Sequence, residues 1–298
     1  MTAARDCFAG YHPAVNFLYF ALVLGFTVCL SHPAYLAVSL LAAFAYSAAL
    51  SPRRALRFAL RCVLPLMLFA ALLNPAFNHA GVTILTYLPS GNPLTLESLL
   101  CGLSSAVLLA AALVWFSCCT AVLTSDKFLY LFGKAAPALA LLLSMTLRFV
   151  PRLRAQLGAI GEARRGLGRG GGRGLLPRAR EGAAQLSVLV TWALENAVET
   201  GDSMRSRGYG LPGRTSYSVY RWSRRDRAAM AWLCFCGLFL LAGALAGALR
   251  WRWFPSLRGP VSAPMTWGFL SVWTALCFTP VILDRREARR WKRSRSAA

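Results

Sequence analysis

The fold is decided first by one long apolar stretch in the middle of the chain, ESLLCGLSSAVLLAAALVWFSCCTAVL, residues 97–123. After Glu97 this stretch carries no charged side chain, and it exceeds the roughly 20 apolar residues that a helix needs to cross a bilayer. Five further stretches have the same or nearly the same character: about 14–31, 33–50, 58–75, 228–249 and 265–283. We therefore predict an all-α polytopic membrane protein with about six transmembrane helices.

The composition of the whole chain agrees with this class. Of the 298 residues, 57% are hydrophobic and 15% are charged. A soluble globular protein is about 45–50% apolar and about 25% charged. The same figures exclude a disordered chain, a collagen-like chain and a coiled-coil rod.

The charged residues are unbalanced in number and uneven in position. Lys and Arg number 33 against 11 Asp and Glu. Eighteen of these basic residues lie in 124–227, seven in the tail 284–298 and four in 51–61, whereas the loop 74–96 has none. Because basic residues concentrate in cytoplasmic loops, this distribution predicts a multi-pass protein with both termini in the cytoplasm. The basic excess is therefore a topology signal, and we expect no binding to nucleic acid.

These assignments divide the chain into four parts. We expect transmembrane helices one to four in residues 1–123, a helical cytoplasmic domain in 124–227, transmembrane helices five and six in 228–283, and a basic cytoplasmic tail in 284–298.

The cytoplasmic domain is expected to consist of two long amphipathic helices separated by a glycine-rich break at 166–174. Pro151 should kink the first helix. The second should run from about Ala179 to Arg207 and end at Gly208. The apolar stripes of the two helices can lie against each other, and each helix presents arginine at its C-terminal end.

Motifs for catalysis or cofactor binding are missing from the sequence. There is no G-x-x-x-x-G-K-[ST] loop for ATP and no H-E-x-x-H pair for zinc. His12, His32 and His79 share no helical face, and we interpret His12 and His32, each followed by proline, as polar caps. No carboxylate or lysine lies in the middle of a span, where it would mark an ion pathway. The sequence therefore predicts no catalytic residue, no metal ligand and no cofactor.

Gly243 and Gly247 form a G-x-x-x-G pattern in the fifth span. Small residues at this spacing allow two helices to approach closely. The pattern serves packing either within this chain or against another membrane subunit.

The sequence resembles a known family. The segment from Ala197 to Thr215, with DSMRSRGYG at residues 202–210, is similar to the second arginine motif of the transmembrane (T) component, EcfT/CbiQ-like, of energy-coupling factor (ECF) ABC transporters. Weaker likenesses run along nearly the whole chain: Tyr11–Asn16, His32-Pro33, Leu73–Asn78, Leu88–Pro93, Thr124–Lys127 and Arg148–Pro151.

The resemblance implies a role and a set of partners. In that family two X-Arg-X motifs end two cytoplasmic coupling helices, each motif binds one of two ATPase subunits, and the membrane part holds a substrate-binding S component. The chain would then be a non-enzymatic scaffold of the bacterial cytoplasmic membrane, with ATP hydrolysis on its partners. The imported vitamin or metal ion would be chosen by another chain.

The two arginine motifs of the family match this sequence to different degrees. Ser206-Arg207-Gly208 matches the second motif directly. The first motif departs from the common Ala-Arg-Gly, because the sequence here reads ARRGLGRG at residues 163–170. Arg165 and Arg169 therefore both remain candidates for the first coupling arginine.

Two other classes of function stay open on the residues alone. One is a membrane-anchored basic interaction protein whose Gly/Arg tract binds acidic partners. The other is a membrane phosphotransferase acting on anionic substrates, although the sequence lacks the clustered carboxylates that its metal would need.

Overall fold

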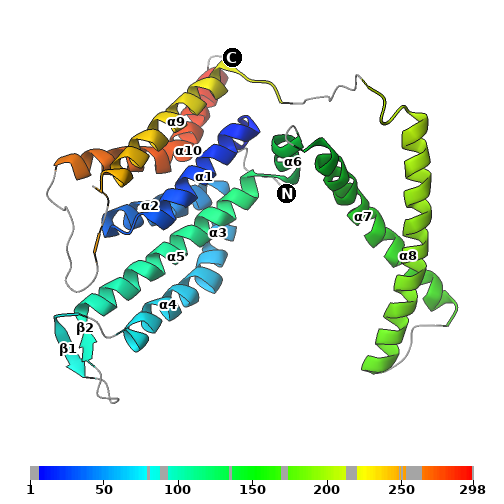
Figure 1. Cartoon of the computed structure of the whole chain (residues 1–298), viewed down its shortest axis with the longest axis horizontal. Coiled ribbons are helices and arrows are strands. Elements are labelled where there is room, and N and C mark those ends of the chain that lie inside the picture. Colours follow the sequence, from blue (N-terminus) through cyan, green and yellow to red (C-terminus); the bar gives the residue numbers. More distant parts are fainter. Residues whose placement is uncertain are drawn as a thin grey trace. The chain divides into compact units, whose positions relative to one another are not determined.

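The structure is a computed structural model of the chain, and it describes residues 7–78, 81–87, 93–133, 136–168, 174–212, 220–247, 249, 251–252 and 264–296. The α-helices and the two strands are labelled in Figure 1. The elements of these residues are, in chain order, η1 (Phe8–Gly10, a 3₁₀ turn), α1 (Pro13–Cys29), α2 (Pro33–Leu50), α3 (Pro52–Phe58), η2 (Ala59–Val63, a π-helical turn), α4 (Leu64–Phe77), β1 (Ile84–Tyr87), β2 (Pro93–Thr95), α5 (Leu96–Val122), α6 (Ser125–Gly133), α7 (Pro137–Gly166), α8 (Leu175–Ser206), α9 (Arg224–Leu245) and α10 (Pro264–Ser296).

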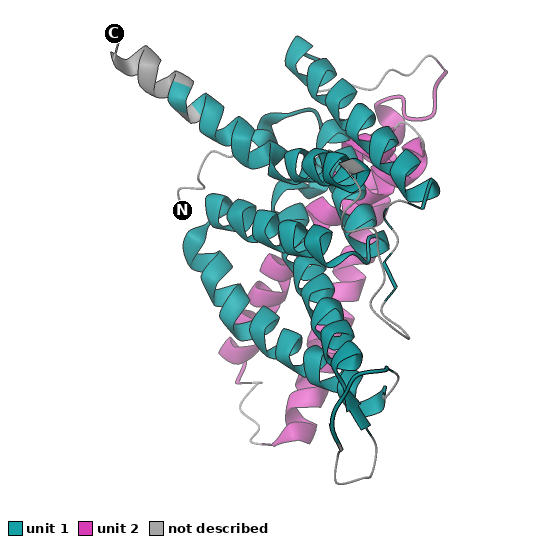
Figure 2. Ribbon diagram, turned by 90° about the vertical axis from the view of Figure 1, so that its left-hand side faces the viewer, with its two compact units in different colours: residues 1–127, 220–298 teal, residues 128–219 magenta. Residues whose placement is uncertain are grey.

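The chain forms two compact units, which are coloured separately in Figure 2. Unit 1 comprises residues 1–127 and 220–298, and unit 2 comprises residues 128–219. The chain leaves unit 1 after Lys127 and returns at Tyr220, so α7 and α8 are an insertion between α5 and α9. Unit 2 falls wholly inside the predicted domain 124–227, whose cytoplasmic placement stays a prediction.

Unit 1 is built around α5, which packs against α1, α2 and α4. α10 packs against α2 and α9, and α9 packs against α1. The interior is rich in aromatic side chains. Those that are fully buried include Phe8, Tyr19, Tyr35, Trp115 and Trp273. These contacts tie segments from both ends of the sequence into one core.

The polar atoms of the buried aromatic residues find partners inside unit 1. Trp115 Nε1 donates to Ser39 Oγ at 3.0 Å, and Ser39 Oγ also shares a hydrogen bond with Thr27 Oγ1 at 2.9 Å. Trp273 Nε1 donates to Tyr35 O at 3.1 Å. Because an unpaired polar group in a dry interior is costly, these bonds determine how the helices can be paired.

Among the described residues, five helical segments are long and apolar enough to cross a membrane: Pro33–Leu50, Pro52–Phe77, Leu96–Val122, Arg224–Leu245 and Met265–Glu287. A sixth apolar helix, α1, is shorter, with 17 residues. The prediction of an all-α polytopic membrane protein is confirmed, although the number of helices that cross the membrane stays a prediction.

Two helices extend well beyond their predicted spans, and α9 lies about four residues earlier in the sequence than the predicted span 228–249. The third helical segment begins at Pro52 rather than near residue 58, because the helix runs through the arginines of α3. Long arginine side chains allow this, since their apolar stems can lie along the helix while the charge reaches water. The last helix continues through the predicted basic tail as far as Ser296.

Proline at the first helical position starts both α1 and α2, and a histidine caps each helix. Nδ1 of His12 accepts from Ala14 N, and Nδ1 of His32 accepts from Ala34 N, both at 3.2 Å. Burial lowers the pKa of His32, which keeps its ring neutral and able to accept. The predicted capping role of the two histidines is confirmed.

A short antiparallel hairpin, β1–β2, precedes α5 and was not anticipated from the sequence. Glu97 in the first turn of α5 is buried and accepts hydrogen bonds from the backbone N–H and the hydroxyl of Thr83. The carboxylate therefore ties the hairpin to the beginning of the helix.

Candidate coupling site

The C-terminal end of α8 is a well-formed Schellman motif with Arg207 at the C-cap. The N–H of Tyr209 donates to Met204 O, and the N–H of Gly208 donates to Arg205 O, both at 3.0 Å. Gly208 adopts a φ of +80°, which a side chain would disfavour. The predicted end of this helix is therefore confirmed. Arg207 is exposed, and its backbone is held by the hydrogen-bonded turn on both sides.

The C-terminal end of α7 is built in a similar way with different residues. Leu167 is the C-cap, Gly168 has a φ of +70°, and the N–H of Gly168 donates to Arg165 O at 2.9 Å. Arg165 is exposed. Arg169, the other candidate for the first coupling arginine, lies outside the described residues.

Comparing the two ends position by position separates Arg165 from Arg207. Counted back from the glycine with positive φ, Arg165 corresponds to Arg205, and Leu167 corresponds to Arg207. The two helices thus end in a similar turn, but Arg207 occupies the C-cap position of α8 whereas Arg165 lies two residues before the C-cap of α7.

α7 and α8 cross as an antiparallel pair within unit 2. Arg164 Nε and Nη2 donate to the two carboxylate oxygens of Glu181 at 2.5 and 2.9 Å, and the rings of Phe149 and Trp192 stack with centroids 5.8 Å apart. Arg207 lies 26 residues beyond Glu181, so a helical rise of 1.5 Å per residue places it roughly 40 Å from this pair. The exposed arginine therefore stands at the far end of a long rod.

The apolar stripes of α7 and α8 do not cover each other as expected. Ile160 is the one buried apolar side chain among the described residues of these two helices. Several stripe residues are exposed: Leu142, Val150, Leu157, Leu186, Leu194 and Val198. The reason is the crossing, because two helices that cross touch over a short length and leave the remaining faces open. Pro151 lies inside α7, which the structure assigns as one continuous helix.

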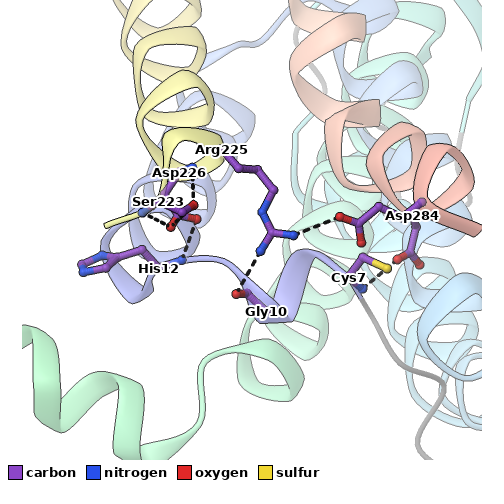
Figure 3. Close-up of polar contacts among 8 residues, drawn as sticks. Cys7, Gly10, His12, Ser223, Arg225, Asp226 and Asp284 are labelled. Atoms are coloured by element: carbon purple, nitrogen blue, oxygen red, sulfur yellow. Dashed lines mark hydrogen bonds and ion pairs between the residues drawn. The ribbon is translucent and has the colours of Figure 1, made fainter. Parts of the chain in front are cut away.

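The segment that returns from unit 2 is anchored by Asp226 at the start of α9 (Figure 3). Asp226 Oδ2 accepts from Ser223 N at 3.0 Å and Ser223 Oγ at 2.7 Å, while Asp226 N donates to Ser223 Oγ at 3.2 Å. This is a capping box. Asp226 Oδ1 also accepts from His12 N at 3.3 Å, and the His12 ring stacks on Trp222 with centroids 4.1 Å apart. One buried carboxylate thus joins the beginnings of α1 and α9.

A second contact in Figure 3 joins the N-terminal segment to α10. Arg225 Nη1 donates to Glu287 Oε1 at 2.9 Å, and its guanidinium lies 4.2 Å from the ring centroid of Tyr11. Cys7 N donates to Asp284 Oδ1 at 2.8 Å. Burial, together with the carboxylates of Glu287 and Asp284, raises the pKa of the Cys7 thiol to about 12. The thiol is therefore protonated at neutral pH.

Lys127, the last residue of unit 1 before the insertion, is also buried and held. Its Nζ donates to Ala9 O at 2.6 Å and to Val122 O at 3.0 Å. The side-chain amide of Asn16 can be oriented to bond both Lys127 and Phe8. In that orientation its oxygen accepts from Lys127 Nζ at 2.9 Å and its nitrogen donates to Phe8 O at 3.0 Å. Both points at which the chain passes between the units are thus attached to the N-terminal segment.

Sequence reasoning did not single out Ser223, Arg225, Asp226 or Lys127 as anchors. The S-x-x-D pattern at 223–226 was a readable signal for the capping box. The contact of Lys127 with Ala9 O could not be predicted from the sequence, because the two residues lie 118 positions apart.

The two glycines of the G-x-x-x-G pattern have separate surroundings. A Cβ on Gly243 would lie 2.5 Å from the ring of Phe269 in α10, so its bare backbone admits that ring. Gly247 follows the end of α9 with a φ of +74° and has no atom within 4 Å of such a Cβ. Their packing against another membrane subunit stays a prediction, as does the docking role of the two arginine ends.

Comparison with known proteins places this arrangement in a family. Residues 12–217 match the model of CbiQ, the cobalt transport protein family. The chain belongs to that family. The match runs from the His12 cap through both inserted helices and past Arg207, so it includes the anchoring segment of α1 and the arginine end of α8.

Two curated relatives bear the same name, energy-coupling factor transporter transmembrane protein EcfT. The relative from Lactobacillus helveticus (strain DPC 4571) is 37% identical over 118 residues, which are 39% of this chain and 43% of that protein. The relative from Lacticaseibacillus paracasei (strain ATCC 334) is 35% identical over 109 residues, 36% of this chain and 39% of that protein. The chain thus matches less than half the length of each relative. It is a multi-pass membrane protein of a transport family.

Proposed function

We propose that this chain is the transmembrane scaffold of an energy-coupling factor importer, through which two ATPase subunits act on a membrane-embedded S component that binds the substrate. The family match and the two EcfT relatives support this assignment. The imported solute is a vitamin or a metal ion, chosen by the S component. The chain itself carries out no catalysis.

The observation that carries the proposal is the end of α8. An exposed guanidinium stands at the C-cap of a 32-residue helix, next to a glycine turn that holds its backbone. Arginine keeps its charge and presents a planar fork of donors, which suits a groove lined by carboxylates or carbonyl oxygens. Because the helix is long, a displacement of the bound ATPase would be passed along α8 as the movement of a rigid rod.

The first coupling contact is assigned to the end of α7, through Arg165 or Arg169. The two arginines make different demands on the turn, since Arg165 lies within the last helical turn and Arg169 follows the glycine Gly168. Replacing each with Ala in turn, and measuring which loss releases one of the two ATPases, distinguishes them.

The decisive experiment compares Arg207→Ala with Arg205→Ala, a matched exposed arginine two residues earlier on the same helix end. After affinity purification from native membranes, Arg207→Ala should retain far less ATPase, because truncating one partner of a desolvated charged contact costs about 2–5 kcal/mol. Arg205→Ala should retain normal amounts, since exposed substitutions cost within about 0.5 kcal/mol.

Uptake by intact cells should fall in step with ATPase retention, and Arg207→Lys should restore only part of both, because lysine keeps the charge but loses the fork. Membrane insertion of all variants should be normal. If Arg207→Ala left ATPase retention and uptake unchanged, Ser206-Arg207-Gly208 would not be a coupling end.

The orientation in the cell membrane, with both termini cytoplasmic, belongs to the same proposal. It predicts that Val82, before the β1–β2 hairpin, and Leu211, after α8, face opposite sides; both are exposed. Single cysteines at these positions in a cysteine-free background should react with a membrane-impermeant maleimide from opposite sides. Labelling from the same side would contradict the orientation.

A further inference from the structure

A cavity of about 300 Å³ lies in unit 1 where α2 ends, α3 begins and α5 completes its last two turns. This volume is at the lower end of the range typical of ligand sites, about 300–1,000 Å³. Its polar lining consists of one arginine and four hydroxyl residues: Arg54, Ser47, Ser51, Ser117 and Thr120. None of these five side chains takes part in the contacts given above for α7 and α8, or in those of Asp226, Arg225 and Lys127.

The charge at this cavity is uncompensated. Within the described part of the chain, the Arg54 guanidinium makes no hydrogen bond or ion pair. Residues 51–61 contain four arginines and no acidic residue. Arg57, one turn away, donates its Nε to Arg53 O at 3.2 Å and does not line the cavity. Arg54 is therefore the cation of this group that is free to bind a ligand inside the cavity.

Hydroxyl donors accompany this charge. The hydroxyl groups of Ser47, Ser51 and Ser117 have no hydrogen-bond partner among the described residues, and Ser51 does not use its side chain to cap α3. Thr120 donates to Ser117 O at 3.0 Å, which leaves its oxygen available only as an acceptor. A guanidinium fork and three serine hydroxyls are a donor set for an oxyanion with several oxygen atoms.

Helix dipoles do not oppose an anion here. The C-terminal ends of α2 and α5 would by themselves repel negative charge. However, α2 passes through Ser51 directly into the N-terminal end of the next helix, so ends of opposite sign lie together. At α5, the Lys127 ammonium binds Val122 O and offsets the negative end. The guanidinium of Arg54 is therefore the charge that decides which ligand is bound.

The remaining lining is apolar and includes Leu50, Ala55 and Phe58. All three belong to helices that are long and apolar enough to cross a membrane, at the ends bearing the arginines of α3. A ligand here must suit both a cation with hydroxyl donors and the hydrocarbon surface beside them. Basic pockets between transmembrane helices bind the head groups of anionic lipids.

We infer that this cavity binds the phosphate-bearing head group of an anionic phospholipid, with its phosphodiester on Arg54 and the serine hydroxyls and its acyl chains in the bilayer. The lipid would join the end of α2 to the end of α5 at the base of the segment that leads into unit 2. Neither the ATPases nor the S component of the proposed transporter is needed for this binding.

The test uses the full-length chain purified in detergent and titrated with phosphatidylglycerol or with phosphatidylcholine of the same acyl chains. Bound lipids are counted by native mass spectrometry. One phosphatidylglycerol should bind about tenfold more tightly than phosphatidylcholine. Both lipids carry the phosphodiester, but the choline ammonium would bring a positive charge close to the Arg54 guanidinium and cancel the net charge of the head group. Millimolar inorganic phosphate should not displace it, because phosphate lacks the acyl chains.

Variants then locate the site. Arg54→Gln should weaken phosphatidylglycerol binding about tenfold or more, and Ser117→Ala should weaken it less. Arg57→Gln is the matched control, which removes the same charge one turn away and should keep the binding. Thermal unfolding of each variant in lipid-free detergent verifies folding, and the comparison of lipids on the unaltered chain needs no variant at all.

Four results would overturn the inference. Equal binding of the two lipids would remove the preference for anionic head groups. Equal losses for Arg54→Gln and Arg57→Gln would indicate diffuse charge rather than a site. Displacement by phosphate alone would make the ligand a soluble anion, and loss of a co-purifying protein in Arg54→Gln with lipid binding intact would make the cavity a protein contact.

Discussion

Unit 1 and unit 2 contain helices of similar length but stabilise them differently. In unit 1, side chains as large as Trp115 and Trp273 are completely buried, and distant segments share hydrogen bonds. In unit 2, Ile160 is the single buried apolar side chain among the described residues of α7 and α8. Unit 1 is therefore stabilised by its own contacts, whereas unit 2 leaves apolar side chains exposed, which is typical of a surface that contacts lipid or another protein.

The charged residues of the two units also differ in how far they are buried. Unit 1 buries Lys127 and Asp226 and satisfies them with backbone and side-chain partners. Unit 2 exposes Arg165 and Arg207 at its helix ends. A buried, paired charge holds a structure in one arrangement, while an exposed one on a rigid helix end is available to another molecule.

The largest effect is expected from removing a core tryptophan of unit 1. Trp115→Ala leaves a cavity and deprives the Ser39 hydroxyl of a donor, and should lower the free energy of unfolding by about 3–5 kcal/mol. Trp192→Ala in unit 2 loses one stacked ring pair and should cost about 1 kcal/mol. Denaturant unfolding in detergent measures both. Equal losses would erase the proposed difference between the units.

Two glycine substitutions should have opposite signs. In Gly243→Ala the new methyl group would overlap the Phe269 ring, so the substitution should destabilise unit 1 by about 1–3 kcal/mol. In Gly161→Ala the nearest atom, on Gln185, lies 3.9 Å away, and higher helix propensity should stabilise α7 by up to about 1 kcal/mol. Thermal unfolding of the two variants is the measurement. A neutral Gly243→Ala would mean that α9 and α10 can separate without cost.

The Asp226 contact at the start of α9, within unit 1, is expected to have an intermediate effect. Asp226→Asn weakens the capping box and the bond to His12 N, and should cost about 1–2 kcal/mol. The control Asp202→Asn changes an exposed carboxylate of α8 and should stay within about 0.5 kcal/mol. Hydrogen exchange at the first turn of α9 should rise in the first variant alone, and an unchanged rate would show that Asp226 does not hold this turn.

The smallest effect on stability at neutral pH concerns Cys7. Because its pKa is raised from 9.0 to about 12, the thiol stays protonated, and its stabilising contribution is complete below pH 9 and lost as the pH rises toward 12. With Cys7 as the only cysteine, maleimide labelling at pH 8 should be about a hundredfold slower or more than labelling of Ser203→Cys in a chain lacking all other cysteines. Comparable rates would mean that the Cys7 thiol is not enclosed by Asp284 and Glu287.

Local features of the fold were readable from the sequence. The two His-Pro caps, the end of α8 at Gly208 and the apolar helices depend on neighbouring residues, and the structure has each of them. The same locality explains why the first coupling arginine was not resolved, since ARRGLGRG offers two arginines around one helix end. The β1–β2 hairpin was missed because its strands have only four and three residues, although ILTY at 84–87 and the turn residues that follow are typical of a hairpin.

Other features depended on residues far apart and could not be predicted. The apolar stripes of α7 and α8 suggested mutual coverage, but how much surface they bury depends on how the helices cross. Likewise, Gly243 and Gly247 look equivalent in sequence, yet one faces the Phe269 ring and the other ends a helix.

The sequence by itself determined the class of the protein, the positions of its helices, its caps and its exposed arginine end, because hydrophobicity and capping act over a few residues. Only the tertiary structure decided which polar groups meet: His12 N with Asp226, 214 residues away, and Cys7 N with Asp284, 277 residues away. It likewise brought Arg54 and the hydroxyls of α2 and α5 around one cavity. Such pairings follow from the packing of whole helices, which no short stretch of sequence encodes.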